Sequence, residues 1–478
     1  MSPHALEALE FERIRDLLTA RAASEPGKER ARALAPLSDP AAARLLSRAT
    51  AEIRALRIES RGWPSLAFPD LRAELRRARV EGELLEAPEL RGIARLLEVA
   101  AEVGAVFAAE GARGRHPLAA ERAARLFADR EFAARLERTL DPSGEVRDEA
   151  SRELRALRRR LRSGRQELAA RLERLSRGVG APGEETLVTL RGGRYVLSVA
   201  LSEKRRWPGI VHDRSASGRS VFLEPLEVVE QNNEIAEIEA DERREVRRIL
   251  LELTAWVREH AAALEETLQV LGELDEWNAR ATLARDLEAS VPLLDESAAA
   301  LRIVRGRHPL LFLAHGARVV PLELTMEGDR RGLIISGPNM GGKTVVLKAV
   351  GLIVLMALCG LHVPAAEGTI IPCVDAIFID MGDEQSLASD LSTYGARLRR
   401  MRAMLAGAGA RSLLLLDELG SGTDPEEGAA LGEALLEEVG GRGAFCLVST
   451  HHGAFKTFAA GSSRFRNAAM DYDPATLS

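Results

Sequence analysis

The sequence is poor in cysteine and has no long hydrophobic run. Its three cysteines, Cys359, Cys373 and Cys446, lack the spacing of a metal site and lie in apolar segments. We therefore expect buried, reduced thiols and a cytoplasmic location. The longest apolar run, residues 349–361, is too short to span a bilayer. Residues 1–15 are charged and lack the apolar core of a secretion signal, so we expect neither a membrane protein nor a secreted one.

The chain also has no excess of positive charge. Its 66 Lys and Arg residues are outnumbered by 72 Asp and Glu residues, which gives a formal net charge of −6. Such a chain exerts no overall attraction on nucleic acid, so any binding of that kind must come from a local patch. A chain of 478 residues is long enough for several domains.

The most informative segment that is present is a phosphate-binding pattern. Residues 337–344 fit G-x-x-x-x-G-K-[ST], between an expected buried strand at 333–335 and an expected apolar helix at 345–358. Glycines let backbone N–H groups point at phosphate oxygens, and the helix N-terminus adds partial positive charge. Lys343 would reach the β- and γ-phosphates, and the Thr344 hydroxyl would bind Mg²⁺. The candidate nucleotide-binding residues are Gly337, Pro338, Asn339, Met340, Gly341, Gly342, Lys343 and Thr344.

A second motif makes ATP the expected substrate. Four leucines at 413–416 form a predicted buried strand that ends in Asp417 and Glu418. Asp417 would hold the same Mg²⁺ as Thr344, and Glu418 would polarise the attacking water. The two motifs together predict an enzyme that binds and hydrolyses ATP with Mg²⁺. A scaffold that only binds nucleotide is an alternative that the intact Glu418 disfavours.

Two further segments follow in the order typical of ABC-type ATPases. A glycine turn at 420–425 comes after Glu418, and a short apolar strand at 447–450 ends in His451. In an open α/β sheet, polar residues at strand ends line one crevice at the carboxyl edge. In this order we expect His451 to sense the γ-phosphate, although a lone histidine at a strand end is more often structural.

These motifs resemble those of MutS-type ATPases, and more closely the second bacterial subfamily (MutS type two) than mismatch-repair MutS. Mismatch-repair members usually continue the Gly-x-Gly-Thr turn with Ser-Thr, where this chain has Asp-Pro-Glu-Glu-Gly at 424–428. The resemblance covers nearly the whole chain. The segments that carry it are residues 337–345, 382–386, 391–394 and 417–424, together with 208–218, which resembles a segment found in type two only.

The resemblance implies paired ATPase heads, and hence a homodimer. Each nucleotide would be held by one P-loop and closed over by the partner's Ser-rich loop. Family members often have Phe-Ser-Ser-His where this chain has Tyr-Gly-Ala-Arg at 394–397, so the trans contacts stay open. The matching trans-subunit residues are Ser392, Thr393, Gly422, Thr423 and Asp424.

The pattern along the chain predicts a multidomain α plus α/β protein. Residues 1–140 have helical periodicity broken by prolines and are expected to form a helical core domain. Residues 141–300 are expected to form lever helices that carry a β-rich clamp insert near 183–225, and residues 301–478 a MutS/ABC-type P-loop ATPase domain.

Three local patterns support the lever and its insert. Gly192 and Gly193 lie between two β-like segments and predict a hairpin turn. Residues 226–290 contain no proline, which indicates a long arm or a pair of helices. Helical spacing is kept by the leucines at 154, 157, 161, 168, 172 and 175.

The expected contacts with nucleic acid lie on this lever. Residues 151–175 contain nine Arg and only three Glu residues. The insert contains the candidates Lys204, Arg205, Arg206 and Trp207, a basic cluster beside an aromatic residue. The alternative is a solvated helix face and a tryptophan packed beneath a hairpin.

The resemblance implies two linked functions. One is binding branched or double-stranded DNA to suppress homologous recombination. The other is gripping collided ribosomes, through their rRNA, and splitting them into subunits. The family's endonuclease activity would reside in a C-terminal small MutS-related domain, which we expect to lie outside these residues. The alternatives are a mismatch-recognising MutS protein, although Phe222–Glu224 matches its probe only by chance, and a chromosome-maintenance-type ATPase.

Overall fold

The computed structural model describes residues 1–59, 63–108, 111–179, 187–216, 218–337, 342–381, 390–421 and 424–470. The chain divides into two compact units, and neither is one continuous stretch. The head unit contains residues 1–68, 102–126 and 268–478, and the lever unit contains residues 69–101 and 127–267. This division differs from the three consecutive blocks expected, because the N-terminal helices bury their apolar side chains in the core of the head unit.

The head unit combines helices with two sheets. Its elements are α1 (Pro3–Ala8), α2 (Phe11–Thr19), α3 (Glu25–Arg32), α4 (Pro40–Glu59), α7 (Ala112–Arg115), α8 (Pro117–Ala123), β5 (Leu293–Asp295), β6 (Ala300–Gly306), α13 (Pro309–His315), η4 (Gly316–Arg318), β7 (Leu322–Glu327), β8 (Gly332–Ser336), α14 (Lys343–Leu358), β9 (Ile370–Pro372), β10 (Ala376–Asp380), α15 (Asp390–Gly407), β11 (Ser412–Leu416), α16 (Pro425–Gly441), β12 (Phe445–Thr450), α17 (Gly453–Gly461) and β13 (Phe465–Ala469).

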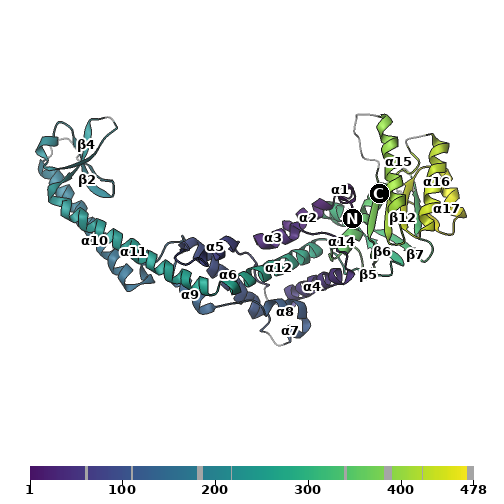
Figure 1. Cartoon of the computed structure of the whole chain (residues 1–478), viewed down its shortest axis with the longest axis horizontal. Helices are drawn as coiled ribbons and strands as arrows, with labels where there is room; N and C mark the ends of the chain where they lie inside the picture. Colours follow the sequence, from purple (N-terminus) through teal and green to yellow (C-terminus); the bar gives the residue numbers. More distant parts are fainter. Residues whose placement is uncertain are drawn as a thin grey trace. The chain divides into compact units, whose positions relative to one another are not determined.

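The larger sheet of the head unit is parallel throughout, in the order β10-β11-β12-β8-β13. Leucines along β11 alternate between its two faces. Leu413 and Leu415 join the apolar core that contains α14, whereas Leu414 and Leu416 pack with α15, α16 and α17. The sheet is therefore covered by helices on both faces (Figure 1), which is why its central strands are continuous apolar runs.

The C-terminal part of helix α14 is buried on all sides, because every residue from Ala349 to Leu358 is buried. A Cβ atom at Gly351 would come within 2.6 Å of the Leu9 side chain and 2.8 Å of the Leu415 side chain. The helix is thus packed between the N-terminal segment and β11. A second, mixed sheet in the order β5-β9-β6-β7 completes the unit, and β5 shows that the sheet region begins before residue 301.

The lever unit is built on two long helices and a small sheet. Its elements are α5 (Arg72–Ala78), α9 (Arg130–Thr139), η1 (Asp148–Ala150), α10 (Arg152–Val179), β1 (Leu187–Arg191), β2 (Arg194–Ala200), η2 (Lys204–Arg206), β3 (Gly209–Arg214), β4 (Ser220–Pro225), η3 (Leu226–Val228) and α11 (Val229–Glu259). Helices α6 (Ala87–Val106) and α12 (Ala261–Asp286) each run from one unit into the other.

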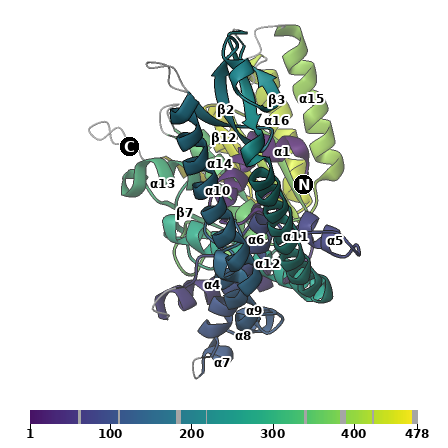
Figure 2. The ribbon, with the colours of Figure 1, turned by 90° about the vertical axis from the view of Figure 1, so that its left-hand side faces the viewer.

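Helices α10 and α11 lie side by side (Figure 2). The leucine stripe of α10 is buried, and Leu161 and Leu168 share one core with Ile235 and Ile238 of α11. The proline-free stretch forms a pair of helices, because α11 ends at Glu259 and α12 begins at Ala261. The sequence pattern therefore predicted these helices correctly.

The expected β-rich insert is an antiparallel four-stranded sheet in the order β1-β2-β4-β3. Gly192 and Gly193 connect β1 to β2 with φ angles of 55° and 79°. Two left-handed residues in succession are what a tight I′ hairpin requires, and glycine adopts them without strain. The predicted hairpin is confirmed.

The three cysteines are free and buried, and burial raises the pKa of the Cys359 thiol to about 12. In the portions of the chain that the structure describes, no helix combines the length and apolar character needed to cross a bilayer.

Candidate nucleotide-binding site

The P-loop lysine lies at the start of α14, directly beyond β8. Gly342 caps this helix with a φ of 74°, a left-handed conformation that glycine tolerates. Lys343 is 4% exposed, and its Nζ donates a hydrogen bond of 2.6 Å to the backbone oxygen of Gly337. Its ammonium group thus reaches back to the first residue of the loop. Pro338, Asn339, Met340 and Gly341 lie outside the described residues.

The two candidate Mg²⁺ ligands meet at the carboxyl edge of the larger sheet. Thr344 Oγ1 donates a 2.7 Å hydrogen bond to Asp417 Oδ2, although the two residues are far apart in sequence. Asp417 is 5% exposed and directly follows β11. A hydroxyl and a carboxylate are the hard oxygen donors that Mg²⁺ prefers, so this pair fits the ion.

Glu418 continues the chain beyond Asp417 in a left-handed conformation, with a φ of 48°. This conformation is uncommon for a residue with a side chain. Its N–H donates a 3.0 Å hydrogen bond to Ser449 Oγ, and its carbonyl accepts one of 2.7 Å from Ser421 Oγ. The backbone around the candidate water-activating residue is therefore fixed from both sides.

His451 lies directly after β12, the strand between β8 and β11. Its side chain is exposed, and its ring centroid is 4.4 Å from that of His452. The His452 ring packs edge-on against Phe455. His451 is thus available to solvent at the edge where Lys343 and Asp417 also lie.

Only some of the expected trans-subunit residues belong to the described part of the chain. Ser392 and Thr393 fall within α15, with side chains outside the described part of the structure, and Gly422 and Thr423 are not described. Asp424 caps α16, because its side chain accepts a hydrogen bond of 2.9 Å from the N–H of Glu426.

Sequence reasoning missed two residues at this edge. Ser449 Oγ donates a hydrogen bond to Asp417 Oδ1. Asp380, the last residue of β10, accepts a 2.7 Å hydrogen bond from the Asp417 N–H through its carbonyl, and its carboxylate is 3.2 Å from Arg400 Nε. Both are polar residues at or near the ends of buried strands, the same signal that identified Asp417.

Comparison with known proteins agrees with these motifs. Residues 333–476 match the family described as MutS domain V. The whole chain is 40% identical to the protein named endonuclease MutS2 of Pelotomaculum thermopropionicum, and the match covers 60% of that relative. Proteins of the same name from Thermomicrobium roseum and Gemmatimonas aurantiaca are also 40% identical, with 61% and 58% of their lengths covered. The chain belongs to the MutS family.

The similarity to these MutS2 members extends over all of this chain, whereas the chain spans only about 60% of the length of the relatives. The expected resemblance to MutS is thus confirmed.

The candidate nucleic-acid residues in the lever unit of this MutS-family chain differ in their exposure to solvent. Lys204, Arg205 and Arg206 are exposed in η2. Trp207 is only 6% exposed and belongs to the same core as Leu197. A tryptophan buried in this way does not offer its ring to a base, so the structure favours the packing alternative and leaves three exposed cations.

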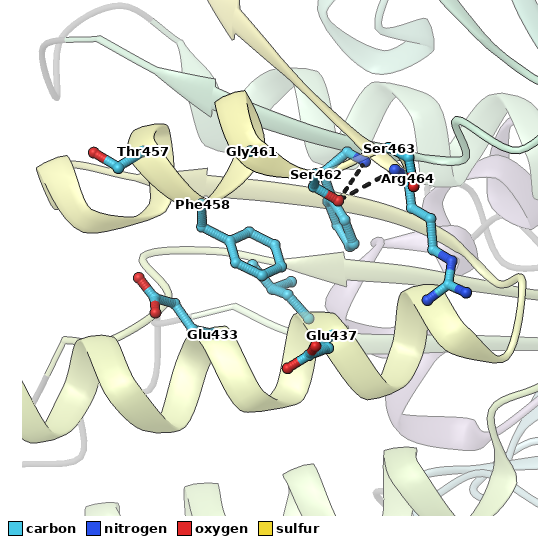
Figure 3. Close-up of a pocket in the computed structure, with 10 residues that line it drawn as sticks. Glu433, Glu437, Thr457, Phe458, Gly461, Ser462, Ser463 and Arg464 are labelled. Carbon is cyan, nitrogen blue, oxygen red and sulfur yellow. Dashed lines mark hydrogen bonds between the residues drawn. The ribbon is translucent and has the colours of Figure 1, made fainter.

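A cleft of about 490 Å³ opens elsewhere on the head unit, between α16, α17 and β13 (Figure 3). Its lining includes Glu433 and Glu437 on one face of α16, Phe458, and Arg464. None of the candidate nucleotide-binding residues lines it. Because the two carboxylates would repel a triphosphate, this cleft is not a candidate nucleotide site.

Proposed function

We propose that this chain is an ATP-hydrolysing, dimeric clamp that binds nucleic acid or ribosomes. The observation that carries the proposal is the 2.7 Å hydrogen bond between Thr344 Oγ1 and Asp417 Oδ2. It joins the end of the P-loop to the carboxylate after β11 at one edge of a parallel sheet. Ligands of open α/β sheets bind at this edge.

Each residue of the proposed site has a role that follows from its chemistry. Lys343, at the N-terminus of α14, would neutralise the β- and γ-phosphates of ATP. Thr344 and Asp417 would hold Mg²⁺, which neutralises phosphate charge when it is bound. Glu418 would orient and deprotonate the attacking water, and exposed His451 would contact the γ-phosphate.

The proposed dimer follows from the family rather than from a contact in this chain. In MutS-type heads the nucleotide lies between two subunits, so ATP binding would draw two heads together and hydrolysis would release them. Residues 301–478 would form this ATPase domain, and the lever unit would carry the movement to the clamp sheet β1–β4. Ser392, Thr393 and the 422–424 turn would act across the interface.

The charge distribution of the lever unit supports binding of a polyanion. Two arginines of α10 form ion pairs with carboxylates in the first half of α11. Arg165 is 2.7 Å from Glu239, and Arg158 is 2.9 Å from Glu242. Arg152 and Arg159 are exposed, seven residues apart and opposite the leucine stripe, and neither has a carboxylate partner among the described residues. The face of α10 opposite its leucine stripe therefore presents these two exposed arginines.

The proposed target is branched DNA, collided ribosomes or both, since phosphate-rich surfaces are common to the two. The relatives carry the name endonuclease, but we propose no phosphodiester cleavage for these residues, because the motifs on which the proposal rests are those expected for nucleotide hydrolysis.

The test is ATP turnover by the purified chain with Mg²⁺, alone and with four-way DNA junctions or isolated disomes. We expect basal turnover that rises when a target is added. Stimulation by junctions alone would assign the DNA function, and stimulation by disomes alone the ribosome function. Absence of turnover under all three conditions would contradict the proposal.

A further inference from the structure

Ser449 connects the two acidic residues of the proposed site. It is the penultimate residue of β12 and is completely buried. Its Oγ donates a hydrogen bond to Asp417 Oδ1 and accepts one of 3.0 Å from the N–H of Glu418. Its backbone oxygen accepts a further hydrogen bond of 3.1 Å from Leu419. Ser449 thus contacts three consecutive residues, 417–419, which follow the neighbouring strand β11.

The chemistry of a hydroxyl matches this double contact. A hydroxyl has one proton to donate and lone pairs left to accept, so Ser449 can serve Asp417 and Glu418 at once. The second oxygen of Asp417 accepts the hydrogen bond from Thr344. Two hydroxyls on opposite oxygens fix the rotation of the carboxylate, so that Oδ2 faces the P-loop helix.

The same contact holds Glu418 in place. A φ of 48° is unfavourable for glutamate, and such a conformation persists only when neighbours stabilise it. Ser449 Oγ accepts from the N–H of Glu418, and Ser421 donates to its carbonyl. Loss of the Ser449 hydroxyl would remove this acceptor from the partly buried N–H of Glu418 and allow the backbone to relax.

We infer that Ser449 is a positioning residue for the proposed ATP hydrolysis. Its hydroxyl would orient the Asp417 carboxylate for binding Mg²⁺, and it holds the backbone of Glu418 in its left-handed conformation. The inference rests on the proposed function. Residues that orient metal ligands through hydrogen bonds commonly affect metal affinity and activity by about 10- to 100-fold.

The experiment must separate this role from that of an ordinary buried serine. Ser412 provides a matched control, because it begins β11 at the opposite end of the same strand pair. It is 4% exposed, and its Oγ accepts a 3.1 Å hydrogen bond from Gly409. Ser449→Ala removes the hydroxyl, Ser449→Cys keeps the shape with a weaker hydrogen-bonding group, and Ser449→Thr keeps the hydroxyl.

The readouts are binding of a fluorescent ATP analogue at increasing Mg²⁺ concentrations, and ATP turnover. For Ser449→Ala and Ser449→Cys we expect binding of the ATP analogue without Mg²⁺ to be unchanged. The Mg²⁺ concentration that gives half of the Mg²⁺-dependent change in binding should rise about tenfold, and ATP turnover should fall by about 10- to 100-fold. Ser449→Thr and Ser412→Ala should behave like the wild type. Thermal melting of each variant establishes that it folds.

Three outcomes would overturn the inference. Ser449→Ala could match the wild type in Mg²⁺ dependence and turnover, or Ser412→Ala could lower both as much as Ser449→Ala. If a folded Ser449→Thr variant lost as much Mg²⁺ affinity and ATP turnover as Ser449→Ala, the Ser449 hydroxyl would not be the cause of these losses. A wild-type chain that binds no Mg²⁺–ATP would instead contradict the proposed function itself, and the inference with it.

Discussion

The head unit and the lever unit place their polar groups in opposite ways. In the head unit, Thr344, Asp417 and Ser449 form a hydrogen-bonded group at the N-terminal end of α14, a helix whose residues from Ala349 to Leu358 are all buried. In the lever unit, α10 buries a single leucine stripe and exposes most of its arginines. Buried hydrogen bonds are sensitive to small displacements, whereas exposed charges are weak individually and screened by salt. We therefore expect all-or-none effects in the head unit and graded effects in the lever unit.

The largest expected effect comes from Glu418→Gln in the head unit. Loss of a general base should lower ATP turnover by about 10²- to 10⁴-fold. Because glutamine keeps the size of the side chain, ATP binding should remain. The trapped ATP complex should accumulate as a dimer in size-exclusion chromatography with Mg²⁺–ATP.

The matched control is Glu426→Gln, an exposed carboxylate in the first turn of α16. It should leave turnover unchanged. Normal hydrolysis by Glu418→Gln would show that another group activates the water.

Acid should destabilise the head unit through its buried histidines. Burial lowers the pKa of His362 to about 4, and Nδ1 accepts a hydrogen bond from Arg54 at 2.9 Å, where a proton would be repelled. Burial also lowers the pKa of His308 to about 4. Since each pKa is lower in the folded chain, the contribution to stability is present above pH 6.5 and is lost as the pH falls through about 4. The loss is about 3 kcal/mol for each residue.

The measurement is denaturant unfolding of the wild type and of His362→Gln between pH 7 and pH 4. The variant should lose about 3 kcal/mol less over this range than the wild type does. Equal losses in the two proteins would mean that His362 is protonated without cost in the folded chain.

A smaller, graded effect is expected in the lever unit. Arg152→Glu combined with Arg159→Glu should weaken binding of double-stranded DNA, because both arginines belong to the open face of α10. If each contacts a phosphate, the slope of log affinity against log salt concentration should fall by about 2. Fluorescence anisotropy at several salt concentrations measures this slope.

The matched control replaces Arg243 and Arg247 of α11 with Glu, which changes the net charge by the same amount. It should leave the slope nearly unchanged. Equal effects of the two double variants would show that the chain responds to overall charge and that α10 presents no special face.

The sequence predicted best what is encoded within one strand, turn or helix. The helix that begins at Lys343, the strand before Asp417 and the Gly192–Gly193 hairpin each depend on a few adjacent residues. What depends on neighbours far along the chain was missed. Nothing local shows that β12 lies between β8 and β11, so the contact of Ser449 with Asp417 was not foreseen. In the same way, only the packing of Leu9 against Gly351 shows that the first helices belong to the head unit.

Trp207 illustrates the limit of reading composition alone. A tryptophan beside three cations is typical both of a nucleic-acid surface and of a small hydrophobic core. The choice depends on whether the ring is covered, and here it is, by the core that includes Leu197 and Val221. Exposure of an aromatic residue is a property of the folded chain, which the pattern of residue types does not contain.

Lys343→Ala tests the central claim, that Mg²⁺–ATP binds at the carboxyl edge of the head unit and is hydrolysed there, most directly. Lys343 is buried and reaches back to Gly337, so its removal takes away the cation of the phosphate site. We predict that the wild type hydrolyses ATP only with Mg²⁺, and that Lys343→Ala lowers turnover by at least about 100-fold while the chain still folds. Turnover unaffected by Lys343→Ala, or a wild type that binds no ATP with Mg²⁺ present, would contradict the account.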